Sequence, residues 1–158
     1  MGINYVWGDA VVELSRLNSH QVHDFARFHA AAAAFTQGFR AVQVVGHHTR
    51  VTVDGKTAQV SSRRLPGSPW QFSASHPVVE DAVAVIFVDL TGDAPDFYIA
   101  PAQWARDDVK QHYAAWLASK GGVRPRNPGS DHTAVELDRI RHWHQRWDIL
   151  ADAGAHQN

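Results

Sequence analysis

The sequence has no cysteine and only one methionine among its 158 residues. Without cysteine, the chain has neither a disulfide scaffold nor a thiolate metal site. It also lacks any apolar run near the roughly 20 residues that cross a bilayer. Residues 1–15 show no basic start followed by an apolar stretch, so we see no signal peptide. These absences predict a cytoplasmic protein with no membrane partner.

The chain has no large excess of either positive or negative charge, since its formal net charge is −1. Hydrophobic residues make up 44% of the chain and charged residues 20%, which is an ordinary globular balance and excludes a disordered polycation. A chain of this length suits one hydrophobic core. We therefore expect a single domain over residues 1–158, with a frayed tail at 151–158.

The charges are unevenly distributed along the chain. Residues 65–105 contain no lysine or arginine, whereas residues 50–64 carry four basic side chains and a single acid. Such asymmetry can mark a face for phosphates, or it can arise from two solvated loops. A second basic loop follows at residues 123–129. The basic residues of these two segments are Arg50, Lys56, Arg63, Arg64, Arg124 and Arg126.

A first helix is predicted over residues 19–37. Ser19 is a favoured N-cap type, apolar residues then recur at helical spacing, and Gly38 stands where a C′ glycine would end the helix. Residues 9–17, which precede it, fit either a short helix or a strand.

A β-rich block follows this helix. Residues 39–45 predict a strand, and Asp54-Gly55 is a strong hairpin signal between strands at 49–53 and 56–62. Residues 82–90 are almost wholly apolar, which is typical of a central strand buried on both faces. Shorter strands are expected at 70–73 and 96–100.

Two further helices are expected to close the domain. Pro101 can occupy a first helical turn, and Gly121-Gly122 can end that helix. The sequence Thr-Ala-Val-Glu at 133–136 has the form of a capping box for the second. The fold class expected is α/β, with a mixed central sheet of about five strands flanked by helices.

Several segments, in this order and spacing, resemble the PD-(D/E)XK restriction-endonuclease-like family. None of them is catalytic, and together they span residues 19–150. The resemblance implies a restriction-endonuclease-like core. The segments are Gly38-Phe39 after the first helix, VIFVDL at 85–90, PDFYIAP at 95–101, HYAAWL at 112–117 and RWDIL at 146–150.

The resemblance also implies where a nuclease site would lie. In that family an acid on one hairpin strand, and an acid or glutamine two residues before a lysine on the next, hold a divalent cation. The matching positions here are Arg50, Gln59 and Ser61. Glutamine is tolerated in parts of the family, but Arg50 would repel a cation and Ser61 cannot supply the lysine charge. The motif is degenerate, so no cofactor is expected.

Three functions remain open at this point. The first is a catalytically degenerate nuclease-like domain that acts as a nucleic-acid-associated binding or regulatory protein, with the six basic residues above contacting phosphates of DNA or another nucleic acid. The second is an active Mg²⁺-dependent DNA endonuclease with relocated ligands, for which the candidates are Asp24, Asp54 and Gln59. The third is a protein-interaction module or homodimer that uses exposed aromatic residues. Three tryptophans would either lie in the core or form an exposed stripe for such an interface: Trp104, Trp116 and Trp143.

Overall fold

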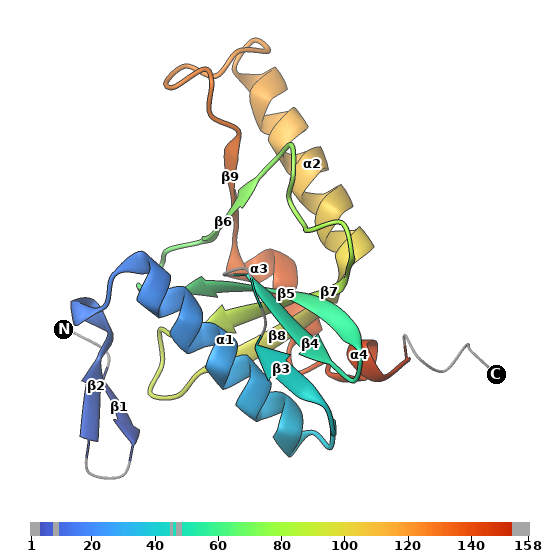
Figure 1. Cartoon of the computed structure of the whole chain (residues 1–158). Coiled ribbons are helices and arrows are strands. Elements are labelled where there is room, and N and C mark those ends of the chain that lie inside the picture. The colour runs from blue at the N-terminus through green and yellow to red at the C-terminus, as the bar shows by residue number, and fades with distance from the viewer. Residues whose placement is uncertain (1–3, 8–9, 45, 47–48, 153–158) are drawn as a thin grey trace.

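A computed structural model describes residues 4–7, 10–44, 46 and 49–152. Its centre is a five-stranded mixed sheet with the strand order β3-β4-β5-β7-β8 (Figure 1). Within this sheet β5 and β7 pair in parallel, and the other neighbours are antiparallel. The expected α/β class and mixed five-stranded sheet are therefore confirmed. The strands are β3 (Val42–Val44), β4 (Arg50–Val53), β5 (Lys56–Arg63), β7 (Ala82–Asp89) and β8 (Asp96–Pro101).

Helix α1 (Ser19–Thr36) covers one face of the sheet (Figure 1). Its N-cap is Asn18, one residue before the predicted Ser19, because Asn18 and Gln21 form a reciprocal capping box. The helix ends at Gly38, whose φ of +93° is a left-handed conformation that glycine adopts without strain. Small side chains let the helix approach the sheet closely, and three of them are completely buried: Ala26, Ala30 and Ala34.

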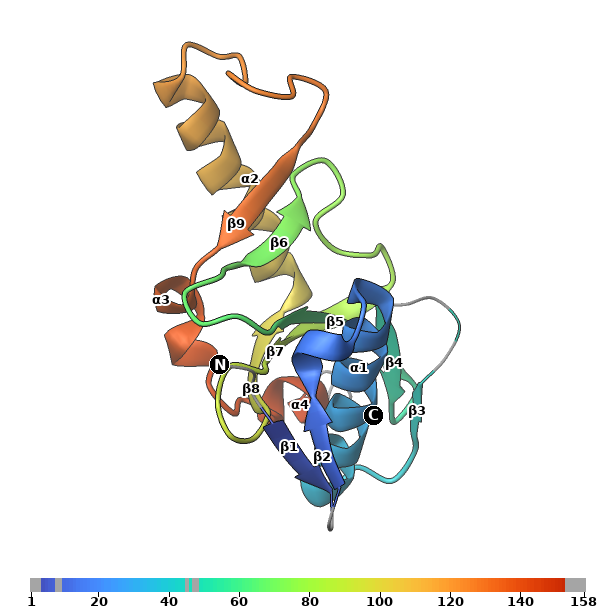
Figure 2. The same cartoon turned by 90° about the vertical axis from the view of Figure 1, so that its left-hand side faces the viewer.

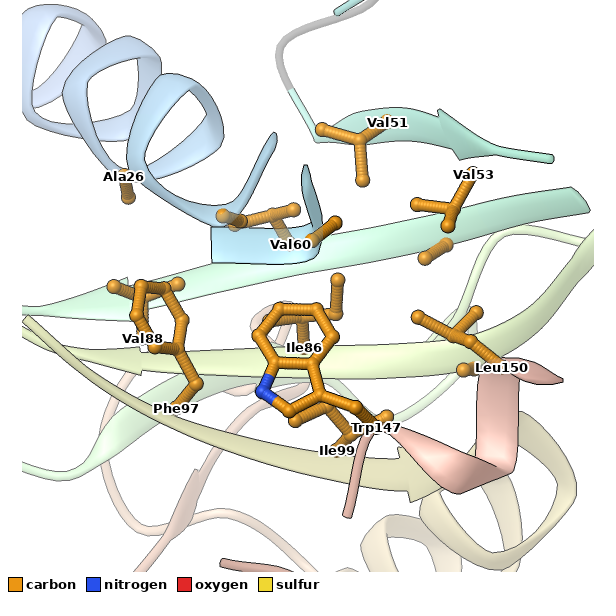
Figure 3. Close-up of a cluster of buried hydrophobic side chains, with 14 of the residues drawn as sticks. Ala26, Val51, Val53, Val60, Ile86, Val88, Phe97, Ile99, Trp147 and Leu150 are labelled. Atoms are coloured by element: carbon orange, nitrogen blue, oxygen red, sulfur yellow. The ribbon is translucent and has the colours of Figure 1, made fainter. Parts of the chain in front are cut away.

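The core between α1 and the sheet is built from alternate strand residues (Figure 3). On β4, Val51 and Val53 point toward α1, so Arg50 and Thr52 must point to the other face. The C-terminal segment closes the open side of this core with Trp147 and Leu150.

The opposite face is covered by α2 (Ala102–Ser119) and by a separate two-stranded sheet (Figure 2). That small sheet pairs β6 (Trp70–Ser73) with β9 (His132–Val135) in antiparallel fashion. Trp70 is fully buried and meets the ring of Phe87 edge-on at 5.6 Å between centroids. The first half of α2 is buried in this second core, while its second half projects beyond the central sheet together with β6 and β9.

The prediction of one continuous last helix is wrong. Residues 133–136 form no capping box, because residues 132–135 form β9 and pair with β6. Glu136 is the N-cap residue of the short helix that follows, without a side-chain capping bond. The helical stretch after β9 is broken into α3 (Leu137–Ile140), a 3₁₀ turn (Arg141–Trp143) and α4 (Asp148–Asp152). A distant strand edge outweighed the local capping signal, since strand pairing satisfies many backbone groups at once.

The chain begins with a hairpin of β1 (Asn4–Trp7) and β2 (Ala10–Glu13), followed by a 3₁₀ turn (Leu14–Arg16). The segment left open between helix and strand thus contains both a strand and a helical turn. At the other end Ala151 and Asp152 complete α4, and the remainder of the expected frayed tail lies outside the described residues. Across the described part of the chain, no helix is long and apolar enough to span a membrane.

Two strand predictions are confirmed. The hairpin β4–β5 turns at Asp54-Gly55, and both residues have positive φ, as a two-residue primed turn requires. Strand β7 lies between β5 and β8 and is buried over most of its length. Val83 is the exception at 39% exposure, and it stands at an irregularity in the pairing with β5, which passes from Thr57–Ala82 to Ala58–Ala84.

The carboxylate of Asp54 binds its own chain rather than projecting freely from the turn. It accepts hydrogen bonds from the backbone amides of Arg40 (3.0 Å) and Ala41 (2.8 Å). The bond from Ala41 is the main reason that the pKa of Asp54 lies below its ordinary value. A lowered pKa means that the charged carboxylate stabilises the fold above the unfolded-state pKa, and that this contribution is lost as pH falls through the folded-state pKa.

Asp54→Asn should lower the melting temperature at neutral pH, because the variant keeps an acceptor oxygen and tolerates positive φ but lacks the charge. The deficit relative to the wild type should begin to shrink as pH falls below about 3.9, the pKa of this carboxyl in the unfolded chain, and should vanish as pH falls through the lower folded-state pKa. Thermal unfolding followed by circular dichroism between neutral and acid pH measures this. Asp54→Ala, which also loses the acceptor, should show an additional deficit that persists at every pH. A deficit of Asp54→Asn that is independent of pH would contradict the assignment.

Candidate functional site

The three positions that match the nuclease motif lie together on the sheet face opposite α1. Arg50 on β4 is the direct cross-strand partner of Gln59 on β5. Ser61 follows two residues later on β5 and therefore points to the same side. The structure thus brings the predicted positions into one place, on the face covered by α2 and by the chain between β5 and β7.

Arg50 is ion-paired at this place. Its guanidinium lies 3.1 Å from a carboxylate oxygen of Asp81, and both side chains are partly exposed. Asp81 also lies within 3.4 Å of the hydroxyl of Thr57. A positive charge therefore stands beside the nearest carboxylate, where it would oppose a divalent cation.

Gln59 uses its whole amide group to hold the chain that crosses from β5 to β7. Its Nε2 donates to the carbonyl of Pro77 (3.1 Å), and its Oε1 accepts from the amide of Val79 (2.8 Å). The side chain is 8% exposed, so these bonds satisfy groups that water does not reach. Ser61 is equally buried and lies beside Phe87 of β7 in the parallel pairing. Both positions contact protein rather than an open cavity.

The crossover segment is fixed at its two ends by arginines as well. Near its end, Arg106 of α2 donates to the carbonyls of Val79, Glu80 and Ala82 at 2.9–3.3 Å. Near its start, Arg63 forms a buried ion pair with Asp89 at 2.6 Å and donates to the carbonyl of Ser68 at 3.0 Å. The guanidinium of Arg63 also lies 4.4 Å from the centroid of the Trp70 ring.

The relocated ligand set is not assembled. Asp24 lies on α1, on the opposite side of the sheet from Gln59, and is ion-paired with Arg27 at 2.7 Å. Asp54 is at the β4–β5 turn, bound to the backbone amides described above. Within the described ranges, no three histidine, aspartate or glutamate side chains are grouped so as to hold a metal ion.

The basic residues predicted on the β4–β5 hairpin do not form one surface. Arg50 and Arg63 belong to one face of the sheet and Lys56 to the other, because side chains alternate along a strand, and Arg64 lies just beyond the end of β5. Lys56 donates to the carbonyl of Leu150 at 2.5 Å. Arg64 donates to two backbone carbonyls before α1, those of Leu14 (3.2 Å) and Leu17 (2.7 Å). All four basic side chains are therefore engaged by their own chain.

The loop after α2 differs from the hairpin in this respect. Arg124 donates to the carbonyls of Arg126, Ser130 and His132 and lies 5.5 Å from the ring of Trp116. The exposed side chain of Arg126 makes no ion pair with any described residue. Trp116 is 39% exposed, whereas Trp104 and Trp143 are packed against the second core. The sequence offered no sign that Arg124 and Trp116 would meet, since only their positions in the fold bring them together.

No protein-family model, no curated protein and no solved structure matches this chain. The class that the structure defines is an α/β protein in which Gln59 and Arg50 bind the segment that crosses from β5 to β7. The arrangement of its own side chains is accordingly the basis for any functional conclusion.

Gln59→Ala should lower the free energy of unfolding by about 1–3 kcal/mol, because it leaves a buried amide and a buried carbonyl without partners. Urea unfolding monitored by tryptophan fluorescence measures this loss. The matched control is Ser61→Ala, a buried position on the same face without the two crossover bonds, which should cost less. Equal stability of Gln59→Ala and the wild type would show that the amide does not hold the crossover.

Arg63→Ala should cost about 3–5 kcal/mol of unfolding free energy, because the buried carboxylate of Asp89 would lose its ion-pair partner. Burial raises the pKa of Asp89, but hydrogen bonds from Arg63 and Thr91 outweigh it and leave that pKa below its ordinary value. Chemical denaturation of the variant beside Arg40→Ala, an exposed arginine, checks the size of the effect. A loss no larger than that of Arg40→Ala would place Asp89 in contact with water rather than in the core.

Proposed function

We propose that this chain is a catalytically inactive restriction-endonuclease-like domain that binds nucleic acid. The order of elements supports the core: a helix, a strand hairpin, a buried strand, a short strand and a second helix follow one another as the resemblance implies. The convergence of Arg50, Gln59 and Ser61 on one face supports the correspondence with the family motif.

The observation that carries the loss of catalysis is the ion pair between Arg50 and Asp81. Mg²⁺ is bound through carboxylates and water, and it dehydrates reluctantly. At this site a guanidinium neutralises the carboxylate, and Gln59 is occupied by the crossover backbone. The side chains that would hold and activate water in a nuclease instead stabilise the fold.

Binding without cleavage is supported by the loop after α2. Residues 109–130 contain four basic side chains and no acidic one. The side chains of Arg126 and Lys120 are exposed at this end of the molecule. Phosphates attract such a surface without any base contact, and salt weakens the attraction through counterion release.

A second candidate function rests on the outer face of α1. Phe28 is 61% exposed and Phe35 is 52% exposed, seven residues apart on the same helix. Phe28 also lines an apolar groove of about 620 Å³ along α1. Exposed apolar surface of this kind is typical of protein interfaces, so a homodimer or a protein partner is the alternative. Light scattering measures the molar mass in solution. A mass equal to one chain, for both the wild type and Phe28→Ser, would exclude the homodimer.

Purified protein should bind DNA at low salt without cutting it. Incubation of plasmid and linear DNA with and without Mg²⁺ should leave both intact, because the motif positions carry Arg50 and Ser61. A gel shift of the same DNA should appear at low salt and fade as salt is raised.

Metal-dependent degradation that is lost in both Gln59→Ala and Asp81→Asn would overturn the inactive assignment. The second variant is needed because Gln59→Ala also weakens the fold. Absence of any shift with DNA or RNA at low salt would overturn the binding assignment and favour the protein interface on α1.

A further inference from the structure

The second half of α2 is unusual for a helix of a small domain, because little of it is covered. Between residues 110 and 119, only Tyr113 and Leu117 are half-buried, and the other side chains are exposed. With the loop 120–131 and the strands β6 and β9, it forms a projection that we call the arm (Figures 1 and 2). Trp70, Phe72 and Val135 of the two strands belong to the second core, whereas most side chains on the second half of α2 are exposed to solvent.

A groove of about 470 Å³ runs along the arm between α2 and β9. This volume is within the range of sites that take a small molecule or a single nucleotide unit. The groove is lined on the α2 side by His112 and Trp116 and on the other by polar and charged side chains. The charged or titratable side chains on this other side are Arg124, His132, Glu136 and Arg139.

Two neighbouring side chains lie against the ring of Trp116. The ring of Tyr113 stacks on it with a centroid distance of 6.0 Å and an interplanar angle of 27°. The guanidinium of Arg124 lies 5.5 Å from the Trp116 centroid. Even so, Trp116 remains 39% exposed, which leaves aromatic surface free in the groove. A planar aromatic surface beside a guanidinium is the arrangement on which nucleobases stack.

Arg124 is preorganised for an anion. Its Nε and Nη1 donate to three carbonyls of the loop and of β9, which fixes the plane of the guanidinium. Its Nη2 donates to none of the described residues, so one edge of the fork is left for a ligand oxygen. A fixed guanidinium loses little conformational entropy when it binds a phosphate.

The acids near the groove do not cancel this positive charge. Asp108 is ion-paired with Arg139 and lies 3.2 Å from His112. Glu136 is exposed and can accept hydrogen bonds from the amino groups of bases. On the loop that carries Arg124, the exposed Lys120 and Arg126 form no ion pair within the described part of the chain, and no acid occurs between residues 109 and 130. The groove therefore combines a stacking surface with a cationic loop.

We infer that the arm groove binds single-stranded nucleic acid, with an unpaired base stacked on Trp116 and the adjoining phosphates bound by Arg124, Lys120 and Arg126. A paired base is already stacked within its duplex and cannot enter such a groove without being unpaired. The inference rests on the proposed function and assigns to it a location and a substrate class.

The test is fluorescence anisotropy with labelled single strands of about 12 nucleotides, a length within the range that single-strand binding surfaces cover. Oligothymidylate and oligouridylate are the two probes, and a DNA duplex of equal length is the comparison. Trp116→Ala should weaken single-strand binding about tenfold or more, since one stacked base is lost, while Trp116→Phe should restore much of it. The double variant Lys120→Ala, Arg126→Ala should reduce the slope of single-strand affinity against salt, on logarithmic axes, by roughly 1.4 units.

The matched controls are Phe28→Ala, which removes an exposed aromatic from α1, and Arg40→Ala, which removes an exposed arginine far from the arm. Both should bind as the wild type does, and circular dichroism should show that every variant is folded. Wild-type binding that is unchanged in the arm variants, or that is confined to the duplex, overturns the inference and leaves the proposed function standing. If the wild type binds neither single strands nor duplex at low salt, the proposed function and the inference both fall. Tighter binding of one probe than the other identifies DNA or RNA as the source of the strand.

Discussion

The parallel pairing of β5 with β7 is the constraint on which the rest of the molecule depends. A parallel pair cannot be joined by a tight turn, so the chain must leave β5 at one end of the sheet and return to the other. Here that crossover runs over the face opposite α1 and contributes β6 on the way. Its backbone lies against a buried sheet face, where every amide and carbonyl needs a partner.

Polar side chains of the sheet face and of α2 supply those partners. Gln59 forms hydrogen bonds to the backbone on either side of Val78. Arg106 donates to three carbonyls of the crossover. Arg63 donates to the carbonyl of Ser68 and forms an ion pair with Asp89. Val78 is buried between these clamps and joins the second core. Of these clamping side chains, Gln59 stands at a position that would carry metal chemistry in a nuclease of the family that the sequence resembles. Since one side chain cannot both hold the crossover and coordinate a cation, its present bonds, with the ion pair of Arg50, account for the loss of catalysis that we propose.

The crossover also explains why an arm exists. Strand β6 projects beyond the central sheet, and β9 pairs with it there. The second half of α2 lies beside these two strands (Figure 2). The exposed end of α2 and the basic loop are thus carried away from the acidic stretch between residues 80 and 96. This separation places the cationic side chains where a negatively charged strand can approach without repulsion from those acids.

The sequence by itself determined the local elements. The α1 helix, the hairpin at Asp54-Gly55 and the apolar strand β7 were predictable, because capping, turn and hydrophobic patterns are properties of neighbouring residues. It also determined that Arg50, Gln59 and Ser61 would share a face, since alternation on paired strands requires it. The residue types at those positions were enough to predict a degenerate motif.

Only the tertiary structure decided what the polar side chains bind. The basic run at 50–64 shows that positive charge is present, but not which way each side chain points. Its side chains bind the carbonyl of Leu150, the carboxylates of Asp81 and Asp89, and backbone carbonyls before α1. The capping signal at 133–136 was likewise overruled by β6, a strand some sixty residues earlier in the chain. Trp116 and Arg124 meet for the same reason: a loop reverses α2 onto β9. Contacts between residues far apart in sequence depend on how elements are placed in space, and local patterns carry no information about that placement.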